Sequence, residues 1–182
     1  MEFWTLINEN VSRPLTIDAA RSSLGAALSE LSSEDVIAFC ETYSEKMNSA
    51  YRWDLWGVAY LINGGCSDDS FMDFRASLIL LGESVYEGAL RDPESLMLLE
   101  ERERSELFEE GALYIGTEAC EAKGLEAPGR QSASSPAGEP WEESREDLMA
   151  RFPKAWAVYG WEEASAVETA PPSAKKPWWK FW

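Results

Sequence analysis

The chain has 182 residues, enough for one domain with extensions, and its 45% hydrophobic content allows an ordinary core. It carries 33 acidic against 16 basic residues, a net charge of −17, which repels phosphate and argues against nucleic-acid binding. There is no histidine, so Ser-His and Cys-His catalysis and histidine metal sites are excluded. An acidic body of this kind suits a basic protein partner, or serves only solubility.

The cysteines and the N-terminus bear on the compartment. The chain has three cysteines, an odd number, and they are widely spaced: Cys40, Cys66 and Cys120. Because no C-x-x-C pair occurs, we expect neither a bound metal nor another cofactor. Free thiols fit a reducing cytoplasm. The start MEFWTLINEN lacks a signal-peptide pattern, and no apolar run approaches about 18 residues, so membrane insertion is not expected.

Apolar residues recur at helical spacing along most of the chain, which predicts an all-α domain of about six helices. A short first helix starts near Phe3 and is interrupted at Pro14, and a second spans about residues 17–31. Neither an internal repeat nor a convincing strand pattern is visible.

The clearest helix start in the sequence is Ser32, which can cap the helix together with Asp35 three residues later. Helical spacing then continues over residues 36–62 without a proline, which predicts one long central helix. The Gly-Gly pair at 64–65 ends it, because glycine adopts the left-handed conformation after a helix without penalty.

Three further helices are predicted before residue 124. Ser67 is a cap for a helix with a buried face up to about residue 85, and Asp92 followed by Pro93 marks another start. An apolar face over residues 107–119 indicates a third.

The chain beyond residue 124 alternates between irregular and helical patterns. Residues 124–140 are rich in Gly, Ala, Ser and Pro and predict a loop. A last helical piece spans about residues 142–159, with a bend expected at Pro153.

The densest run of unusual residues is YRWDLWGVAYLINGGCSDDSFMDFR, over residues 51–75. It resembles the core motif of an uncharacterised bacterial family, domain of unknown function 4240. The N-terminal FWTLI and the later EPW…DL…RFPKAWAVY segment stand in the order of that family, so the resemblance covers residues 1–160. It implies a helical fold and a bacterial origin, and it implies no activity.

This block allows two interpretations. In the first, an enzyme such as a hydrolase has a pocket near the turn between the helices. The candidate pocket residues are Trp53, Asp54, Asn63, Cys66, Asp68, Asp69 and Arg75. In the second, which we favour, the block is a structural junction, where Asp54 accepts an indole N–H or pairs with Arg75 and fastens adjacent helices.

Two finer hypotheses within the block are weaker. Asp68, Asp69 and Asp73 suggest a metal site, but they do not share one helix face and the calcium-loop pattern is missing. The simpler explanation is that acidic side chains in the first turn of a helix interact favourably with the positive end of the helix dipole. Cys66 precedes a helix N-terminus, which lowers a thiol pKa, yet nothing obvious would activate it. We expect a buried structural cysteine.

The chain ends in a basic, aromatic segment behind a proline-containing linker. The predicted partner-binding residues are Lys175, Lys176, Trp178, Trp179, Lys180, Phe181 and Trp182. Large exposed aromatics mark contact sites, and Trp is the strongest hot-spot residue at interfaces. The segment could dock into an apolar pocket of another protein, fold back onto the acidic domain, or sit at a membrane interface. We favour the first.

Together these patterns predict a non-enzymatic, cytoplasmic bacterial interaction protein in three parts. Residues 1–160 are an acidic helical domain, 161–177 a flexible linker and 178–182 an aromatic peptide motif. The body would bind a basic partner and the tail would dock on a protein, in an immunity-like or an adaptor role. The alternative is an enzyme centred on the 51–75 block.

Overall fold

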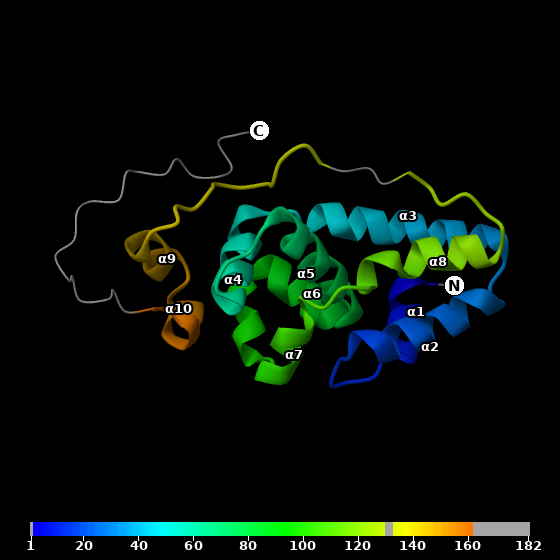
Figure 1. Cartoon of the computed structure of the whole chain (residues 1–182), viewed down its shortest axis with the longest axis horizontal. Coiled ribbons are helices and arrows are strands. Elements are labelled where there is room, and N and C mark those ends of the chain that lie inside the picture. Colours follow the sequence, from blue (N-terminus) through cyan, green and yellow to red (C-terminus); the bar gives the residue numbers. More distant parts are fainter. Residues whose placement is uncertain (1, 130–132, 162–182) are drawn as a thin grey trace.

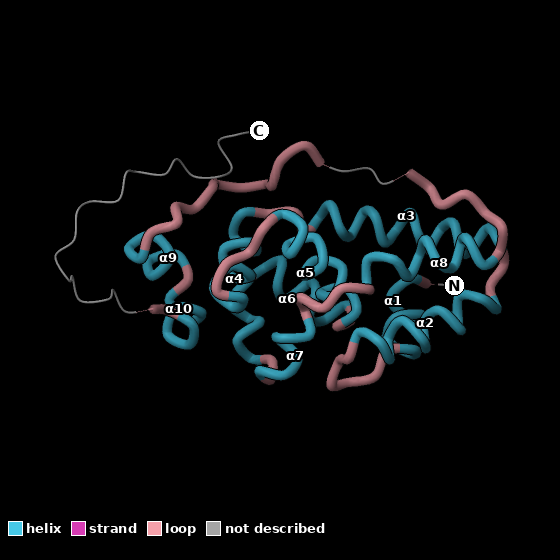
Figure 2. Tube along the Cα trace, in the orientation of Figure 1, coloured by secondary structure: helices cyan, strands magenta, loops and turns pink. Residues whose placement is uncertain are grey.

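The computed structural model describes residues 2–129 and 133–161. Within these ranges the backbone forms α-helices and short 3-10 helices and no strand (Figure 2). The one sheet-like pairing there is an isolated bridge between Arg52 and Ala137. The all-α prediction is confirmed, although the helices are shorter and more numerous than the six expected.

The helices form three groups along the long axis of the molecule. In chain order they are α1 (Phe3–Asn10), α2 (Ile17–Glu30), α3 (Ser33–Ser49), α4 (Trp53–Asn63), α5 (Asp68–Leu80), α6 (Glu83–Arg91), η1 (Pro93–Leu98), α7 (Glu101–Glu106), η2 (Ala112–Tyr114), α8 (Ile115–Ala122), α9 (Arg145–Arg151) and α10 (Pro153–Tyr159). Helices α1, α2, α3 and α8 gather at one end, α4 to α7 in the middle, and α9 and α10 at the other end (Figure 1).

Several helix boundaries follow the predicted local chemistry. Ser32 Oγ accepts a hydrogen bond from the Asp35 N–H at 3.1 Å, and Ser67 Oγ accepts one from the Ser70 N–H at 3.2 Å. Gly64 ends α4 with a φ of 64°, in the left-handed region that favours glycine. Short-range side-chain chemistry therefore determines where α3 and α5 begin and where α4 ends.

The predicted long central helix is wrong at one point. Helix α3 ends at Ser49 and α4 begins at Trp53, with Arg52 in an extended conformation between them. Ala137 donates its N–H to the Tyr51 carbonyl at 2.8 Å and accepts the Trp53 N–H at 2.9 Å. The helix is interrupted because the backbone pairs with a loop distant in sequence, which apolar spacing cannot reveal.

Four later predictions also need correction. The helix predicted from Ser67 to about residue 85 ends at Leu80, because Gly82 takes a φ of 88° and a separate helix begins at Glu83. Asp92 caps the 3-10 helix η1 rather than an α-helix. The predicted face over residues 107–119 is divided, because Gly111 takes a φ of 134° between α7 and η2. The last helical piece is two helices that meet at Phe152, and Pro153 is the first residue of α10 rather than a bend.

The described parts of the connecting segment lie beside the helices: residues 123–129 beside α8 and α3, and residues 133–144 past the junction of α3 and α4 before α9 begins (Figure 1). In its described part, the Ala133 N–H donates to Asn48 Oδ1 at 3.2 Å, and Ala137 forms the bridge near Arg52. The predicted loop over residues 124–140 is confirmed for its described residues, 124–129 and 133–140, and it is bonded to the helices at both points.

The C-terminal helical pair docks on α4 at a glycine. A Cβ atom at Gly57 would lie 2.2 Å from the Phe152 ring and 3.1 Å from Trp141, so only glycine lets these rings approach. Trp141 is 1% exposed and its ring lies 4.9 Å from that of Tyr60. Helices α9 and α10 thus share the core of the molecule.

Candidate functional site

The 51–75 block is an aromatic stack that joins α4 to α5. The ring of Trp56 lies 5.3 Å from Trp53 and 4.8 Å from Phe71, nearly parallel to both, and Phe74 follows Phe71 at 5.8 Å. The indole N–H of Trp56 donates to the Cys66 carbonyl at 3.0 Å. Such contacts hold two helices in register, and they favour the structural interpretation of the block.

The expected contact between Asp54 and Arg75 is not formed. The Arg52 guanidinium instead makes two hydrogen bonds with the Asp54 carboxylate, at 2.6 and 3.0 Å. Asp54 also accepts the Leu55 N–H at 2.8 Å. Asn63 lies in the turn after α4 and donates to the Gly65 carbonyl at 2.9 Å. These polar groups therefore form hydrogen bonds with residues one or two positions away in the sequence.

Arg75 is a buried cation without an ion pair among the described residues. Its side chain is 7% exposed and donates to the Met47 carbonyl at 2.9 Å and the Phe71 carbonyl at 3.3 Å. Its guanidinium lies over the Tyr51 ring at 4.4 Å. Burial lowers the pKa of Arg75, and the nearby Asp68 charge opposes that effect. Aromatic faces and carbonyls partly replace the lost hydration.

Cys66 and Asp68 lie near Arg75, close enough for the Asp68 charge to act on both. Burial raises the pKa of the Cys66 thiol to about 12, so burial outweighs any effect of the following helix. Asp68 accepts a hydrogen bond from the Tyr51 hydroxyl at 3.3 Å. Within the described ranges, no group of three or more Cys, Asp or Glu side chains is placed to hold a metal ion.

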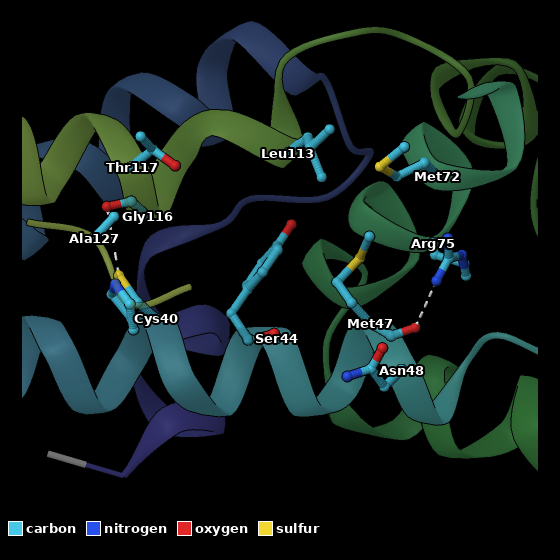
Figure 3. Close-up of a pocket in the computed structure, with 12 residues that line it drawn as sticks. Cys40, Ser44, Met47, Asn48, Met72, Arg75, Leu113, Gly116, Thr117 and Ala127 are labelled. Carbon is cyan, nitrogen blue, oxygen red and sulfur yellow. Dashed lines mark hydrogen bonds between the residues drawn. The ribbon is translucent and has the colours of Figure 1, made fainter. Parts of the chain in front are cut away.

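A pocket of about 80 Å³ opens between α3, α5 and the η2–α8 segment (Figure 3). Met47, Met72 and Leu113 supply apolar wall, and Arg75 lies at one side with its hydrogen bond to the Met47 carbonyl. Ala127 brings the connecting loop to the opposite side. Elements from four parts of the chain therefore build one apolar hollow with a cation at its edge.

Acidic residues stand beside this pocket. An adjoining hollow of about 430 Å³ is lined by Glu41 and Glu45, and it shares Ser44, Asn48 and Pro128 with the pocket. Both glutamates are exposed.

Acids gather near α5 as well. Burial, then the charge of Glu110 and of Asp69, raises the pKa of Asp73, so these three acids lie close together. Asp73 follows Met72 of the pocket along α5. The apolar hollow thus has acidic neighbours on α3 and on α5.

Of the residues predicted from the sequence, Arg75 alone lines this pocket. Trp53, Asp54, Asn63, Cys66, Asp68 and Asp69 do not line it. Sequence reasoning missed Met47, Met72 and Leu113, because methionine and leucine at helical spacing look like ordinary core. The predicted partner-binding residues 175–182 and the linker after residue 161 lie outside the described residues.

Over its described residues the molecule is thus an acidic all-α protein with an aromatic helix junction and, beside it, a pocket with both apolar and polar lining residues. The chain belongs to the family described as protein of unknown function DUF4240, whose model matches residues 1–122. The predicted family is confirmed, and α9 and α10 lie beyond the matched range. No curated protein and no solved structure matches the chain.

Among the helices that the structure describes, none combines the length and the apolar character needed to cross a membrane.

Proposed function

We propose that this chain is a non-enzymatic protein-interaction module whose acidic body binds a basic segment of a partner protein. In this proposal the partner inserts an apolar anchor residue into the pocket of Met47, Met72 and Leu113. The observation that carries the proposal is an apolar hollow with exposed acids beside it on α3.

The size of the pocket fits a side-chain anchor, and the adjoining hollow of about 430 Å³ leaves room for the residues that flank the anchor. Ligand pockets usually measure about 300–1,000 Å³, and a cavity of about 150 Å³ already holds benzene. At about 80 Å³ the pocket matches part of a side chain, such as an aliphatic or aromatic tip. Interface hot spots have this form, with one residue seated in a small apolar recess.

The chemistry of the lining supports an adaptable protein partner. Methionine is unbranched and polarisable, so Met47 and Met72 can repack around anchors of different shape. Glu41 and Glu45 would attract lysine and arginine beside the anchor and speed association. Two of the five guanidinium donors of Arg75 are used, which leaves others for carbonyls of the docked segment.

We place the protein in a bacterial cytoplasm and propose that residues 178–182 dock into an apolar pocket of another protein. An immunity-like role would use the acidic body, and an adaptor role would use both the body and the tail. The net charge of −17 supports the first role.

A fluorescent synthetic helix of leucine and lysine with one apolar face tests the pocket directly. We expect saturable binding that weakens with added salt, because lysine–glutamate attraction is screened. Met72→Gln should weaken binding about tenfold, since burying an amide in an apolar recess costs about 1–3 kcal/mol. The matched control is Met149→Gln on α9, where the methionine is exposed and far from the pocket.

Two outcomes would contradict the proposal. In one, a scrambled peptide of the same composition binds as tightly as the amphipathic helix. In the other, the Met72→Gln variant binds like the wild type while its melting temperature is unchanged.

The enzyme alternative has less support. Its candidate nucleophile, Cys66, is 5% exposed, and its pKa of about 12 keeps the thiol protonated at neutral pH. Its candidate carboxylate Asp54 pairs with Arg52 and does not line the pocket.

A further inference from the structure

Two cysteine sulfur atoms face each other between α3 and α8. The Sγ atoms of Cys40 and Cys120 are 3.5 Å apart, and both cysteines are free thiols. Because α3 and α8 pack side by side, this pair spans a helix interface between distant parts of the chain. Cys66 contacts the neighbouring Ser67 carbonyl instead, so it serves as an internal reference.

Cys40 is the member of the pair that solvent can reach. It is half-buried and lines the pocket, whereas Cys120 is fully buried (Figure 3). The Cys40 thiol donates to the Gly116 carbonyl at 3.4 Å. A Cβ atom at Gly116 would lie 3.0 Å from Cys40 Sγ, so the glycine leaves the sulfur room to move.

We propose that Cys40 and Cys120 form an oxidation site, at which a hydroperoxide converts the two thiols into one intramolecular disulfide linking α3 to α8. The contact between the sulfur atoms carries this proposal, and it does not depend on what the pocket binds.

The reaction balances in two steps. The Cys40 thiolate attacks the hydroperoxide, the O–O bond breaks, and an alcohol or water leaves while Cys40 becomes a sulfenic acid. The Cys120 sulfur then attacks the Cys40 sulfur, the S–O bond breaks, and water leaves. Two electrons pass from the sulfur atoms to the peroxide, and the leaving oxygens take up the two thiol protons.

The environment of the two cysteines determines how fast Cys40 is oxidised. Burial first, and then the neighbouring Cys120, raise the pKa of Cys40 to about 12, and the charge of Glu41 acts in the same direction. Thiolate is therefore scarce at neutral pH, and the oxidation rate should rise about tenfold per pH unit below that pKa. The site would respond to prolonged oxidant exposure rather than to a brief pulse.

Disulfide formation would be visible as stabilisation. The bond would close a long loop, from residue 40 to residue 120, and cross-links across long loops restrict the unfolded chain most. For a domain of this size we expect the melting temperature to rise by roughly 10 °C.

The full chain is incubated with hydrogen peroxide at about pH 8.5 for a time that allows for the raised pKa of Cys40. It is then unfolded in denaturant so that the buried Cys66 can react, alkylated, and analysed by intact mass and peptide mapping. We expect a loss of two hydrogen atoms in mass, a peptide pair joined through Cys40 and Cys120, and alkylation of Cys66 alone. The rise in melting temperature should disappear after dithiothreitol treatment. Cys66→Ser should behave like the wild type, whereas Cys40→Ala should form no cross-link.

Three results would overturn the proposal. The first is retention of all three free thiols after an exposure about a thousand times longer than dithiothreitol needs for full oxidation in a parallel sample, which allows for the lower thiolate fraction of Cys40. The second is a cross-link that contains Cys66 or joins two chains. The third is an intramolecular cross-link that still forms in the Cys40→Ala variant. Because mapping uses the wild-type chain, the first two readouts hold even where a cysteine variant folds poorly.

Discussion

Gly57 shows how one residue positions a whole helical pair. Gly57→Ala places a methyl group against the buried Phe152 ring, at 2.2 Å from its nearest atom. Because Phe152 is 5% exposed and packed, it cannot move away freely, and overpacking of this kind costs about 1–3 kcal/mol. Urea unfolding of the variant measures the loss.

The matched control is Gly25→Ala in α2. Nothing lies within 4 Å of a Cβ atom there, and Gly25 sits in the helix interior. Alanine should stabilise the protein by about 0.5–1 kcal/mol at this position. Equal effects of the two substitutions would mean that helix propensity, and not the contact with Phe152, decides the outcome at Gly57.

Glu103 is a buried acid whose effect on stability depends on pH. It accepts hydrogen bonds from the Arg13 guanidinium and, at 3.1 Å, from the Leu15 N–H. The contact with Arg13 holds the pKa of Glu103 below its ordinary value of 4.5. The carboxylate therefore stabilises the fold above that value, and the contribution is lost as pH falls through the lower folded-state pKa.

We expect Glu103→Gln to cost about 1–2 kcal/mol at neutral pH and progressively less below about pH 4.5. Unfolding curves of the wild type and the variant across this range provide the measurement. Glu101→Gln is the control, because Glu101 is exposed on the same helix, α7. A cost for Glu103→Gln that stays constant with pH would show that shape, rather than charge, matters at this site.

At the scale of elements, helix α10 depends on a carboxylate from η1. Glu94 is 9% exposed and its Oε1 accepts the N–H of the buried Ala155 at 2.8 Å. Glu94→Ala leaves that N–H unsatisfied, which costs about 1–3 kcal/mol. We expect faster amide hydrogen exchange in α9 and α10, with α2 unchanged.

Glu94→Gln is the matched variant for this contact. Its amide oxygen can still accept the Ala155 N–H, so exchange in α10 should stay near the wild-type rate. If the alanine and glutamine variants exchange alike, the hydrogen bond does not hold α10 in place.

The elements also show what a single sequence can and cannot predict. Caps at Ser32 and Ser67 and the stop at Gly64 are local, so the residue types alone indicate them. The break after Ser49 depends on pairing with Ala137, and helical spacing carries no trace of it. Helix ends that depend on local side chains can therefore be predicted from one sequence, whereas helix ends that depend on tertiary contacts cannot.

The pocket residues also divide into those that the local sequence indicates and those that only tertiary contacts bring together. Arg75 is predicted as a site residue because it belongs to the unusual run over residues 51–75 and is a possible partner of Asp54. Met47 and Leu113 come together only when α3 meets the η2–α8 segment, so no short motif marks them. A site assembled from separate elements has no signature in one sequence.

At the scale of the whole molecule, salt should act in opposite directions on folding and on binding. A net charge of −17 repels itself, and raising the ionic strength from about 0.01 to 0.15 M shortens the screening length from about 30 to 8 Å. We expect a higher melting temperature but weaker binding of the leucine–lysine helix. Salt changes that strengthen binding would contradict an electrostatic role for Glu41 and Glu45.

Deletion of the C-terminal segment tests whether the helical body is equally stable without it. Large rings of the body find their partners among described residues, as Trp141 does with Trp53 and Tyr60. Deletion of residues 175–182 should therefore shift the melting temperature by no more than about 2 °C, since 1 kcal/mol moves a domain of this size by roughly 2–4 °C.

A labelled peptide of residues 161–182, added to the truncated protein, separates docking on a partner from fold-back. The peptide carries Lys175, Lys176 and Lys180 and its own aromatics, so it resembles the basic segments proposed for the pocket. If the tail serves another protein, its binding to the body should be weak, and Met72→Gln should not change it. Tight binding that Met72→Gln abolishes, together with a melting loss of several degrees on truncation, would instead make the tail an internal ligand of the pocket.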